Sequence, residues 1–337
     1  MHWTWTSILL AIAVAGLLAL VGFVAALPWI VQPFLRLALK LRYDRTVLGR
    51  DRVPRTGPVL LVSNHITWFD GFFLAATIPR RGTALVNAGV FNLPLVGFLA
   101  RRCGLLSIPY SGPKAQKAAI RTAQGALDAG QLLGIFPEGQ LTRTGFTGTF
   151  HRGLEVILHG REQVPVVPVF IDNVWGSLLS YSEGRFLWKR PRGLRRRVVI
   201  AFGPPIAGSV TVFQVRQAIL ELGVAARAAL TTQVVPIGTI DPSLPQWRHP
   251  TLGLLAASVP DNEAGGAKQV GQKPGTVGHS IPGLALRAVD EHGTAVGPGV
   301  VGALDVLRPG DAKWVGTGRR GQIDRDGFVT LEPAEAG

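Results

Sequence analysis

A histidine followed five residues later by an aspartate is the feature of this sequence best suited to chemistry. His65 comes after the apolar run 59–62, which reads as a buried strand, and Asp70 stands where an apolar helix begins. A histidine at the carboxyl end of a strand lies at the edge where open α/β sheets bind ligands. If the turn folds back, the carboxylate holds one imidazole nitrogen while the other faces a substrate. Such a pair predicts a general base that acts without a nucleophile of the protein's own.

The alternative for this spacing alone is a satisfied core histidine with Asp70 as a helix cap. A second polar turn favours the catalytic interpretation over this alternative, because Phe136-Pro137-Glu138-Gly139 also ends an apolar run. Together, Asn64-His65-x4-Asp70 and this turn resemble the motifs of the glycerolipid acyltransferase family, which includes the lysophosphatidic acid acyltransferases. The stretches 104–109 and 164–169 fit the same family, so the resemblance covers about residues 45 to 210.

The resemblance implies transfer of a fatty acyl group from acyl-CoA or acyl carrier protein to a lysophospholipid hydroxyl, without a further cofactor. His65 would remove the hydroxyl proton and Asp70 would fix the tautomer. Backbone N–H groups near Asn64 or Gly139 are candidate donors to the oxyanion.

The same resemblance assigns substrate binding to the residues around the two motifs: Asn64, Phe136, Pro137, Glu138, Gly139 and Arg143. Glu138 would accept a hydrogen bond from the acceptor, or else cap its own turn. Arg143 would contact a phosphate, or else be an ordinary surface residue.

The run Ser107–Ser111 lacks the arginine that lysophosphatidic acid acyltransferases usually carry there. This departure weakens the case for 1-acylglycerol-3-phosphate as acceptor and favours a phosphodiester of the 2-acylglycerophosphoethanolamine type.

Alternating strands and helices predict an α/β fold, with a mixed sheet flanked by helices. The expected strands are 59–62, 83–87, 104–108, 132–136, 165–171 and 198–202, and the expected helices are 91–102, 114–129, 151–160 and 211–230.

The amino-terminal segment predicts a membrane anchor. No charged side chain occurs in residues 7–35, and the core 8–30 is long enough to cross a bilayer. Basic residues follow the segment, so its far end and the catalytic domain are expected on the cytoplasmic side of the cell inner membrane. A bent element in one leaflet is the alternative, because Pro28 and Pro33 interrupt the segment.

Charge and cysteine content agree with that location. Residues 1–240 hold 26 Lys and Arg against 10 Asp and Glu, whereas residues 241–337 hold 9 against 11. A basic body suits membrane phospholipids, and the absence of an RNA-binding signature argues against nucleic acid. The run 185–197 is either a solvated loop or a docking site for anionic lipid. One cysteine allows no internal disulfide, and no zinc-ligand spacing predicts a metal site.

The carboxyl-terminal part has a different character. Residues 269–278, 314–319 and 324–328 resemble part of an adenylate-forming acyl ligase, a likeness covering about residues 250–330. Arg319 stands where that family has the ribose-binding aspartate, and the phosphate loop is missing, so we expect no adenylation. The predicted segments are therefore 1–45 (membrane anchor), 46–231 (acyltransferase), 232–249 (linker) and 250–337 (a small, β-rich ligase fragment).

Two functions remain open. The first is a membrane-bound acyltransferase, and the second is a catalytically silent membrane adaptor with a ligase-derived interaction tail. Because every residue assigned to chemistry precedes position 232, we expect a chain ending near residue 235 to retain acyl transfer.

Overall fold

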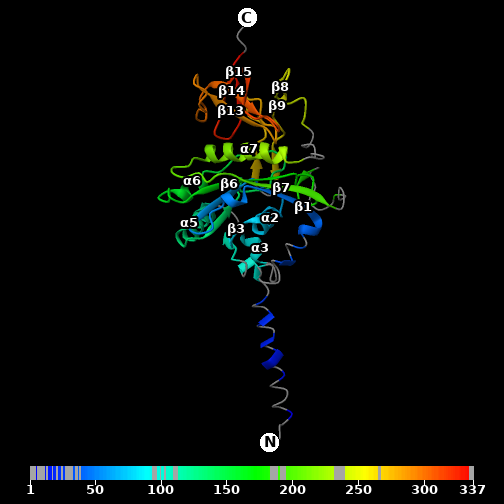
Figure 1. Ribbon diagram of the computed structural model, residues 1–337, viewed down its shortest axis with the longest axis vertical. Coiled ribbons are helices and arrows are strands. Elements are labelled where there is room, and N and C mark those ends of the chain that lie inside the picture. The colour runs from blue at the N-terminus through cyan, green and yellow to red at the C-terminus, as the bar shows by residue number, and fades with distance from the viewer. Residues whose placement is uncertain are drawn as a thin grey trace.

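The computed structural model describes the body of the chain and only scattered positions of its amino-terminal segment. Described are residues 39–92, 97, 98, 100, 101, 104–108, 113–182, 189, 195–230, 240–264 and 267–333, with isolated helical positions between 5 and 37. The body has two parts, an α/β part and a β-rich C-terminal module, defined here as residues 246–331 (Figure 1).

A mixed sheet forms the centre of the α/β part. Among the described residues it has seven strands in the order β1-β7-β6-β2-β5-β3-β4. Their bounds are β1 (Tyr43–Leu48), β2 (Val59–Ser63), β3 (Thr83–Asn87), β4 (Leu106–Ile108), β5 (Leu132–Ile135), β6 (Val166–Asp172) and β7 (Arg196–Phe202). Strands β6, β2, β5, β3 and β4 run parallel, whereas β7 is antiparallel to β6.

Helices cover both faces of this sheet, which explains why residues 59–62 of β2 are all apolar. Leu60 and Val62 pack in one core with α5 (Pro113–Asp128), α6 (Gly153–Leu158) and α7 (Val212–Ala228). Val59 and Leu61 point to the other face and pack with α2 (Asp70–Thr77). The short helices η1 (Arg50–Arg52) and α3 (Ala88–Phe91) complete the elements of this part.

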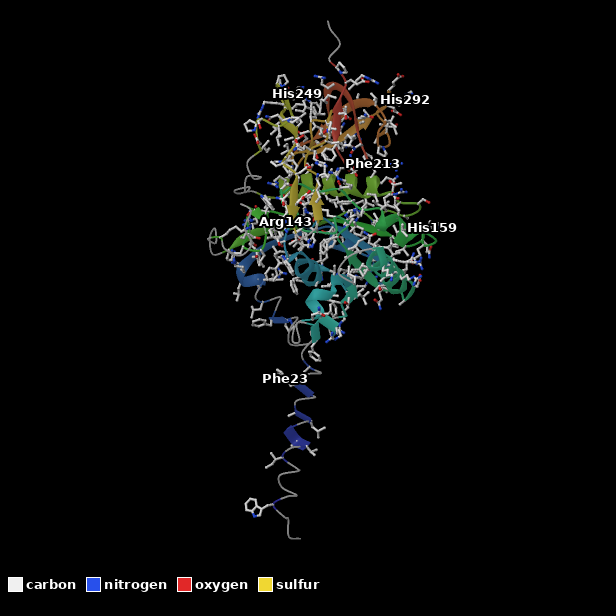
Figure 2. All side chains as sticks on the ribbon, turned by 180° about the vertical axis from the view of Figure 1, so that it is seen from behind. Phe23, Arg143, His159, Phe213, His249 and His292 are labelled. Atoms are coloured by element: carbon white, nitrogen blue, oxygen red, sulfur yellow. The ribbon has the colours of Figure 1, made fainter. Side chains whose placement is uncertain are left out.

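Helix α7 begins at a capping box, in which Thr211 and Gln214 satisfy each other's backbone N–H groups. One side of α7 packs on the sheet, and the other side faces the C-terminal module (Figure 1). Leu220 and Val224 of α7 share a buried cluster with Ala285, and Phe213 packs against the module's core (Figure 2). The helix is therefore an interior layer between two β structures.

The C-terminal module consists of short strands. These are β8 (Gln246–His249), β9 (Gly253–Ala257), β10 (Asn262–Ala264), β11 (Ala267–Gln269), β12 (His279–Ser280), β13 (Ala285–Val289), β14 (Gly302–Leu307), β15 (Val315–Ile323) and β16 (Val329–Leu331). They pair as β12-β9-β8, β10-β11 and β13-β14-β15-β16. The shared core includes Trp247, Leu255 and Leu304, so the module has a hydrophobic centre of its own.

The sequence predicted the mixed α/β sheet, and the structure confirms it. Strand β1 was missed, because its charged residues were assigned to the end of the membrane segment; it crosses the boundary expected at residue 45. The stretch 232–249, which was expected as linker, contains strand β8. This strand pairs with β9 and therefore belongs to the C-terminal module. The expected helix 91–102 falls partly outside the described residues.

The predicted membrane helix is not supported by the structure. Most of residues 8–30 lie outside the described part of the chain. Among the residues that are described, no helix combines the length and the apolar character needed to cross a bilayer.

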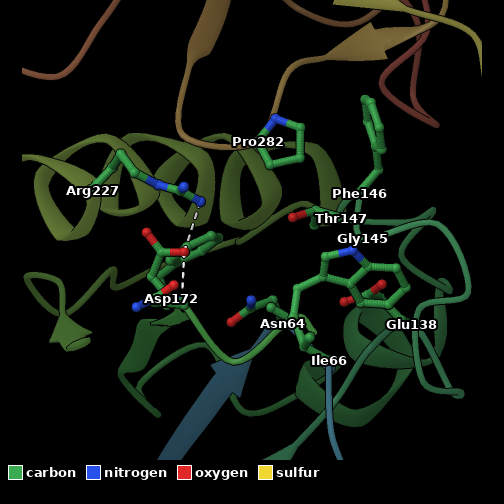
Figure 3. A pocket seen from close by; sticks show the side chains of 12 residues that line it. Asn64, Ile66, Glu138, Gly145, Phe146, Thr147, Asp172, Arg227 and Pro282 are labelled. Atoms are coloured by element: carbon green, nitrogen blue, oxygen red, sulfur yellow. Dashed lines mark hydrogen bonds and ion pairs between the residues drawn. The ribbon is translucent and has the colours of Figure 1, made fainter. Parts of the chain in front are cut away.

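We expect the buried ion pair between α7 and β6 to hold the helix on the sheet. Arg227 Nη2 donates to Asp172 Oδ1 at 2.8 Å, and the two side chains are 13% and 4% exposed (Figure 3). Burial raises the pKa of the Asp172 carboxyl, and the Arg227 charge opposes that rise. Arg227→Met should lower the free energy of unfolding by about 3–5 kcal/mol, because it leaves a buried carboxylate unpaired.

Urea denaturation of the full chain measures this loss. Adding Asp172→Asn to Arg227→Met should recover part of it, because the unpaired charge is then removed. An Arg227→Met protein with the wild-type midpoint would show that the pair contributes nothing.

Candidate active site

His65 and Asp70 form the pair that the sequence predicted. His65 leaves the carboxyl end of β2 and Asp70 is the first residue of α2, with His65 Nδ1 3.0 Å from Asp70 Oδ2. The Asp70 side chain is fully buried, whereas the His65 side chain is 21% exposed. One ring nitrogen is therefore held by the carboxylate, and the imidazole remains accessible to a substrate.

The turn between the two residues is built around the aspartate. Asp70 Oδ2 accepts from the backbone N–H groups of Ile66 and Thr67 at 2.5 and 2.8 Å. Asp70 Oδ1 accepts from Thr67 Oγ1 at 2.6 Å. These donors fix the carboxylate, so the direction of its bond to His65 is set before any substrate arrives.

The second motif lies beside the first because β2 and β5 are adjacent and parallel, with Val62 paired to Ile135. Phe136 follows β5, and its ring stacks on the His65 imidazole at 4.0 Å between centroids and 14° between planes. This contact orients the imidazole from the side that Asp70 does not reach. Phe136 is thus a positioning residue for His65 in this geometry.

Glu138 links the two motifs through its buried carboxylate. Oε1 accepts from His65 N at 2.8 Å, and Oε2 accepts from Gly148 N at 2.9 Å. The residue is 4% exposed, and burial raises the pKa of its carboxyl to about 7 against the lowering effect of those two bonds. Glu138 therefore holds the two turns together, as the capping alternative expects, and its hydrogen bond to an acceptor hydroxyl stays a prediction.

Asn64 also has a structural role, and its substrate contact stays a prediction. Its Nδ2 donates to Ile171 O at 3.0 Å and its Oδ1 accepts from Ile171 N at 2.8 Å. The side chain is buried and completes the pairing of β2 with β6. Both polar atoms of its amide thus bond to the backbone of β6.

The remaining residues of the second turn have defined positions. Gly139 has φ of +67°, a conformation that favours glycine, and its N–H donates to Phe136 O at 3.0 Å. That N–H closes the turn, and which backbone N–H groups near Asn64 or Gly139 serve the oxyanion stays a prediction. Pro137 O accepts from His151 N at 2.9 Å, which brings the His151 ring against Gly139.

Arg143 lies in the 139–150 loop, defined here as the segment between the Pro-Glu-Gly turn and α6. Its guanidinium carbon lies 3.2 Å from the centroid of the Tyr181 ring (Figure 2). Its backbone N–H donates to Gln269 Oε1 at 2.7 Å. The phosphate contact assigned to Arg143 stays a prediction.

The sequence analysis missed three residues whose hydrogen bonds support the site without facing a substrate. Thr67 was detectable, because a threonine three residues before a helix-initial aspartate is a local capping pattern. Thr142, whose N–H donates to His65 O at 2.9 Å, and the buried Arg216 of α7 had no such signal. Both act across long sequence distances.

A small cavity lies between Asn64 and the C-terminal module (Figure 3). Asp172, Asn173 and Arg227 are among the residues that line it, and each has a buried side-chain atom without a hydrogen-bond partner in the structure: Asp172 Oδ2, Asn173 Oδ1 and Arg227 Nε. The space open to water inside it is about 20 Å³, which is room for one water molecule. His65 is not among the lining residues.

Comparison with known proteins gives a consistent result for the α/β part. Residues 44–172 match the family model described as Acyltransferase. The 1-acyl-sn-glycerol-3-phosphate acyltransferase BAT2, chloroplastic, of Brassica napus is 24% identical over 143 residues, which is 42% of this chain and 41% of that protein. A lyso-ornithine lipid O-acyltransferase of Pseudomonas aeruginosa is 37% identical over 116 residues, 34% of this chain and 43% of that protein. This chain spans about two fifths of the length of these curated relatives.

Solved structures add little beyond this. The 1-acyl-sn-glycerophosphate acyltransferase PlsC of Thermotoga maritima aligns over 61% of this chain and 81% of that chain, with 21% identity and a TM-score of 0.49. A luciferase-like enzyme of Zophobas morio aligns over 26% of this chain and 24% of that chain, with 21% identity and a TM-score of 0.21. Both TM-scores are below 0.5, so the ligase likeness of residues 250–330 stays a prediction.

The pKa of Glu138 predicts a pH dependence of stability that Glu138→Gln should remove. An unfolded glutamate has a pKa of 4.5, and the folded value is about 7, so the folded chain binds an extra proton between these values. Its stabilising contribution is therefore full below the unfolded pKa and is lost as pH rises through the folded pKa. Between pH values below 4.5 and above 7, the contribution of Glu138 to the free energy of unfolding should fall by on the order of 3 kcal/mol.

Denaturation midpoints of both proteins across this range give the measurement. The stability difference between wild type and Glu138→Gln should fall as pH rises, because only the wild type releases the proton. A difference that is the same at every pH would contradict the assignment.

Proposed function

We propose that this chain transfers a fatty acyl group from a thioester donor to a lysophospholipid hydroxyl, because residues 44–172 match the family model described as Acyltransferase. The observation that carries the proposal is the His65–Asp70 pair, 3.0 Å apart, with the imidazole accessible and braced by Phe136. The donor is acyl-CoA or acyl carrier protein.

In the proposed reaction, His65 removes the proton of the acceptor hydroxyl as its oxygen attacks the thioester carbonyl. Asp70 accepts the Nδ1–H bond and stabilises the imidazolium that forms. Collapse of the tetrahedral intermediate breaks the carbon–sulfur bond, and the proton held by His65 passes to the departing thiolate. No acyl-enzyme is required, because the two substrates react directly.

The acceptor is proposed from the relatives and from Arg143. The matched proteins are named for acylation of 1-acyl-sn-glycerol-3-phosphate and of a lyso-ornithine lipid. Arg143, stacked on Tyr181 beside the second turn, is our candidate for an anionic headgroup contact. A 2-acylglycerophosphoethanolamine is the phosphodiester alternative within the same class.

Membrane association of the catalytic domain is proposed from an exposed apolar surface beside the pair. Trp68 and Phe72 are 53% and 44% exposed, on the turn and helix that carry His65 and Asp70. Aromatic rings at such a position suit the interfacial region of a bilayer. The acceptor would then enter from the membrane without crossing water, on the cytoplasmic side.

His65→Ala should lower turnover by about 10²–10⁴-fold, because it removes the base that acts in the transition state. Binding of the lysophospholipid should change little. Asp70→Asn should cause a large loss of the same kind, and the double variant should be no worse than His65→Ala, since the pair acts as a unit.

Membranes carrying the protein, supplied with labelled acyl-CoA and a panel of lysophospholipids and lyso-ornithine lipid, give the test. His65→Ala with wild-type melting and wild-type rate would refute the assignment of the base. A well-folded wild type that acylates nothing in the panel, with either donor, would favour the silent adaptor.

For the membrane surface, we expect Trp68→Ser with Phe72→Ser to weaken binding to anionic vesicles roughly tenfold or more, because two large apolar side chains are lost. The experiment uses protein lacking residues 1–35, so that the amino-terminal segment does not mask the effect. Val156→Ser is the matched control, since Val156 is 48% exposed on α6, across the sheet from α2. Equal vesicle binding by all three proteins would exclude this surface.

A further inference from the structure

Gln269 of the C-terminal module bonds at both ends of its amide to the loop that supports His65. Its Nε2 donates to Leu141 O at 2.7 Å, and its Oε1 accepts from Arg143 N at 2.7 Å. The residue between these two, Thr142, donates its N–H to His65 O at 2.9 Å. A single side chain from β11 therefore holds the three-residue stretch that contacts the backbone of His65.

A second attachment reaches the same loop from α7. Arg216 is 2% exposed and donates to Gly148 O at 3.3 Å and to Thr147 O at 3.2 Å. Gly148 N in turn donates to Glu138, whose other oxygen accepts from His65 N. The guanidinium is thus linked to the backbone of His65 by a chain of three hydrogen bonds, through Gly148 and Glu138.

The C-terminal module completes the burial of Arg216. A Cβ placed on Gly327 would collide with Arg216 Nη1, so the backbone of the β15–β16 turn lies directly against the guanidinium. Burial lowers the pKa of Arg216 to about 10, and the carboxylates of Glu138, Asp324 and Asp326 oppose that lowering. Two of those three opposing charges belong to the C-terminal module.

Apolar contact joins the same two parts. Phe146 of the 139–150 loop is 3% exposed and forms a buried cluster with Ala257 and Val259 of the module. The loop therefore lies beneath the module, held at its beginning by Gln269, in its middle by Phe146 and at its end through Arg216.

We propose that the C-terminal module is an intramolecular brace for the 139–150 loop, and that Gln269 is a positioning residue for the acyl transfer. The proposal rests on the proposed function for the reaction, but the brace is a separate physical claim. Without Gln269, Leu141 and Arg143 lose their shared anchor, and the backbone contact of Thr142 with His65 loosens. The activity of a chain ending near residue 235, expected from sequence to be retained, should then be lost in large part.

The test uses the full chain with Gln269→Ala and Gln269→Glu. Alanine removes both bonds, whereas glutamate keeps an acceptor for Arg143 N–H but sets a carboxylate oxygen against Leu141 O. Gln246→Ala is the matched control, because Gln246 donates only to Pro242 O, away from the loop. Since Gln269 is partly exposed, water replaces its bonds and the melting temperature should change little.

Hydrogen exchange at the Arg143 and Thr142 amides reports the brace without reference to activity. Both Gln269 variants should speed this exchange, and Gln269→Ala should do so by roughly tenfold, as expected for two lost hydrogen bonds. The same variant should raise the KM for the lysophospholipid or lower kcat by roughly tenfold, whereas Gln246→Ala should match wild type in both assays.

Unchanged exchange in Gln269→Ala would overturn the brace. Faster exchange with unchanged kinetics would overturn the positioning role. A wild type without transfer activity would refute the proposed function, and exchange alone would then decide whether the module braces the loop.

Discussion

The candidate site depends on one buried carboxylate that joins two strand ends. Glu138 accepts from the N–H of His65 and from that of Gly148, so it fixes the residue after β2 to the loop that follows β5. Removing it would leave two buried backbone donors unpaired at the place where the imidazole must be held. Glu138 sets the backbone position of His65. The His65–Asp70 bond, the Phe136 stack and the Arg216 contacts all depend on that position.

Sequence reasoning found what short-range patterns encode. The apolar runs predicted the strands that carry His65 and Phe136, because a strand buried on both faces is apolar at every position. The spacing from His65 to Asp70 predicted their hydrogen bond, since both lie in one short turn. The parallel pairing of β2 with β5 then brought the two motifs together, as expected of an α/β sheet.

What sequence could not show was the role of residues whose partners lie far along the chain. Asn64 and Glu138 were assigned to substrate binding, because the resemblance to the acyltransferase family carries that role over to the residues around its two motifs. The structure gives their atoms to Ile171, His65 and Gly148, and no local pattern distinguishes a backbone partner from a ligand. Strand β1 was missed for a similar reason, because only its pairing with β7 compensates for its charged residues.

The burial of Arg216 has a consequence for how the chain unfolds. Its guanidinium is enclosed by α7, the 139–150 loop and the turn at Gly327. If either the α/β part or the C-terminal module unfolds alone, this charge is exposed or loses its partners. Together with the cluster of Leu220, Val224 and Ala285, it couples two cores that would otherwise be thermodynamically independent. We therefore expect the α/β part and the C-terminal module to unfold as one cooperative unit.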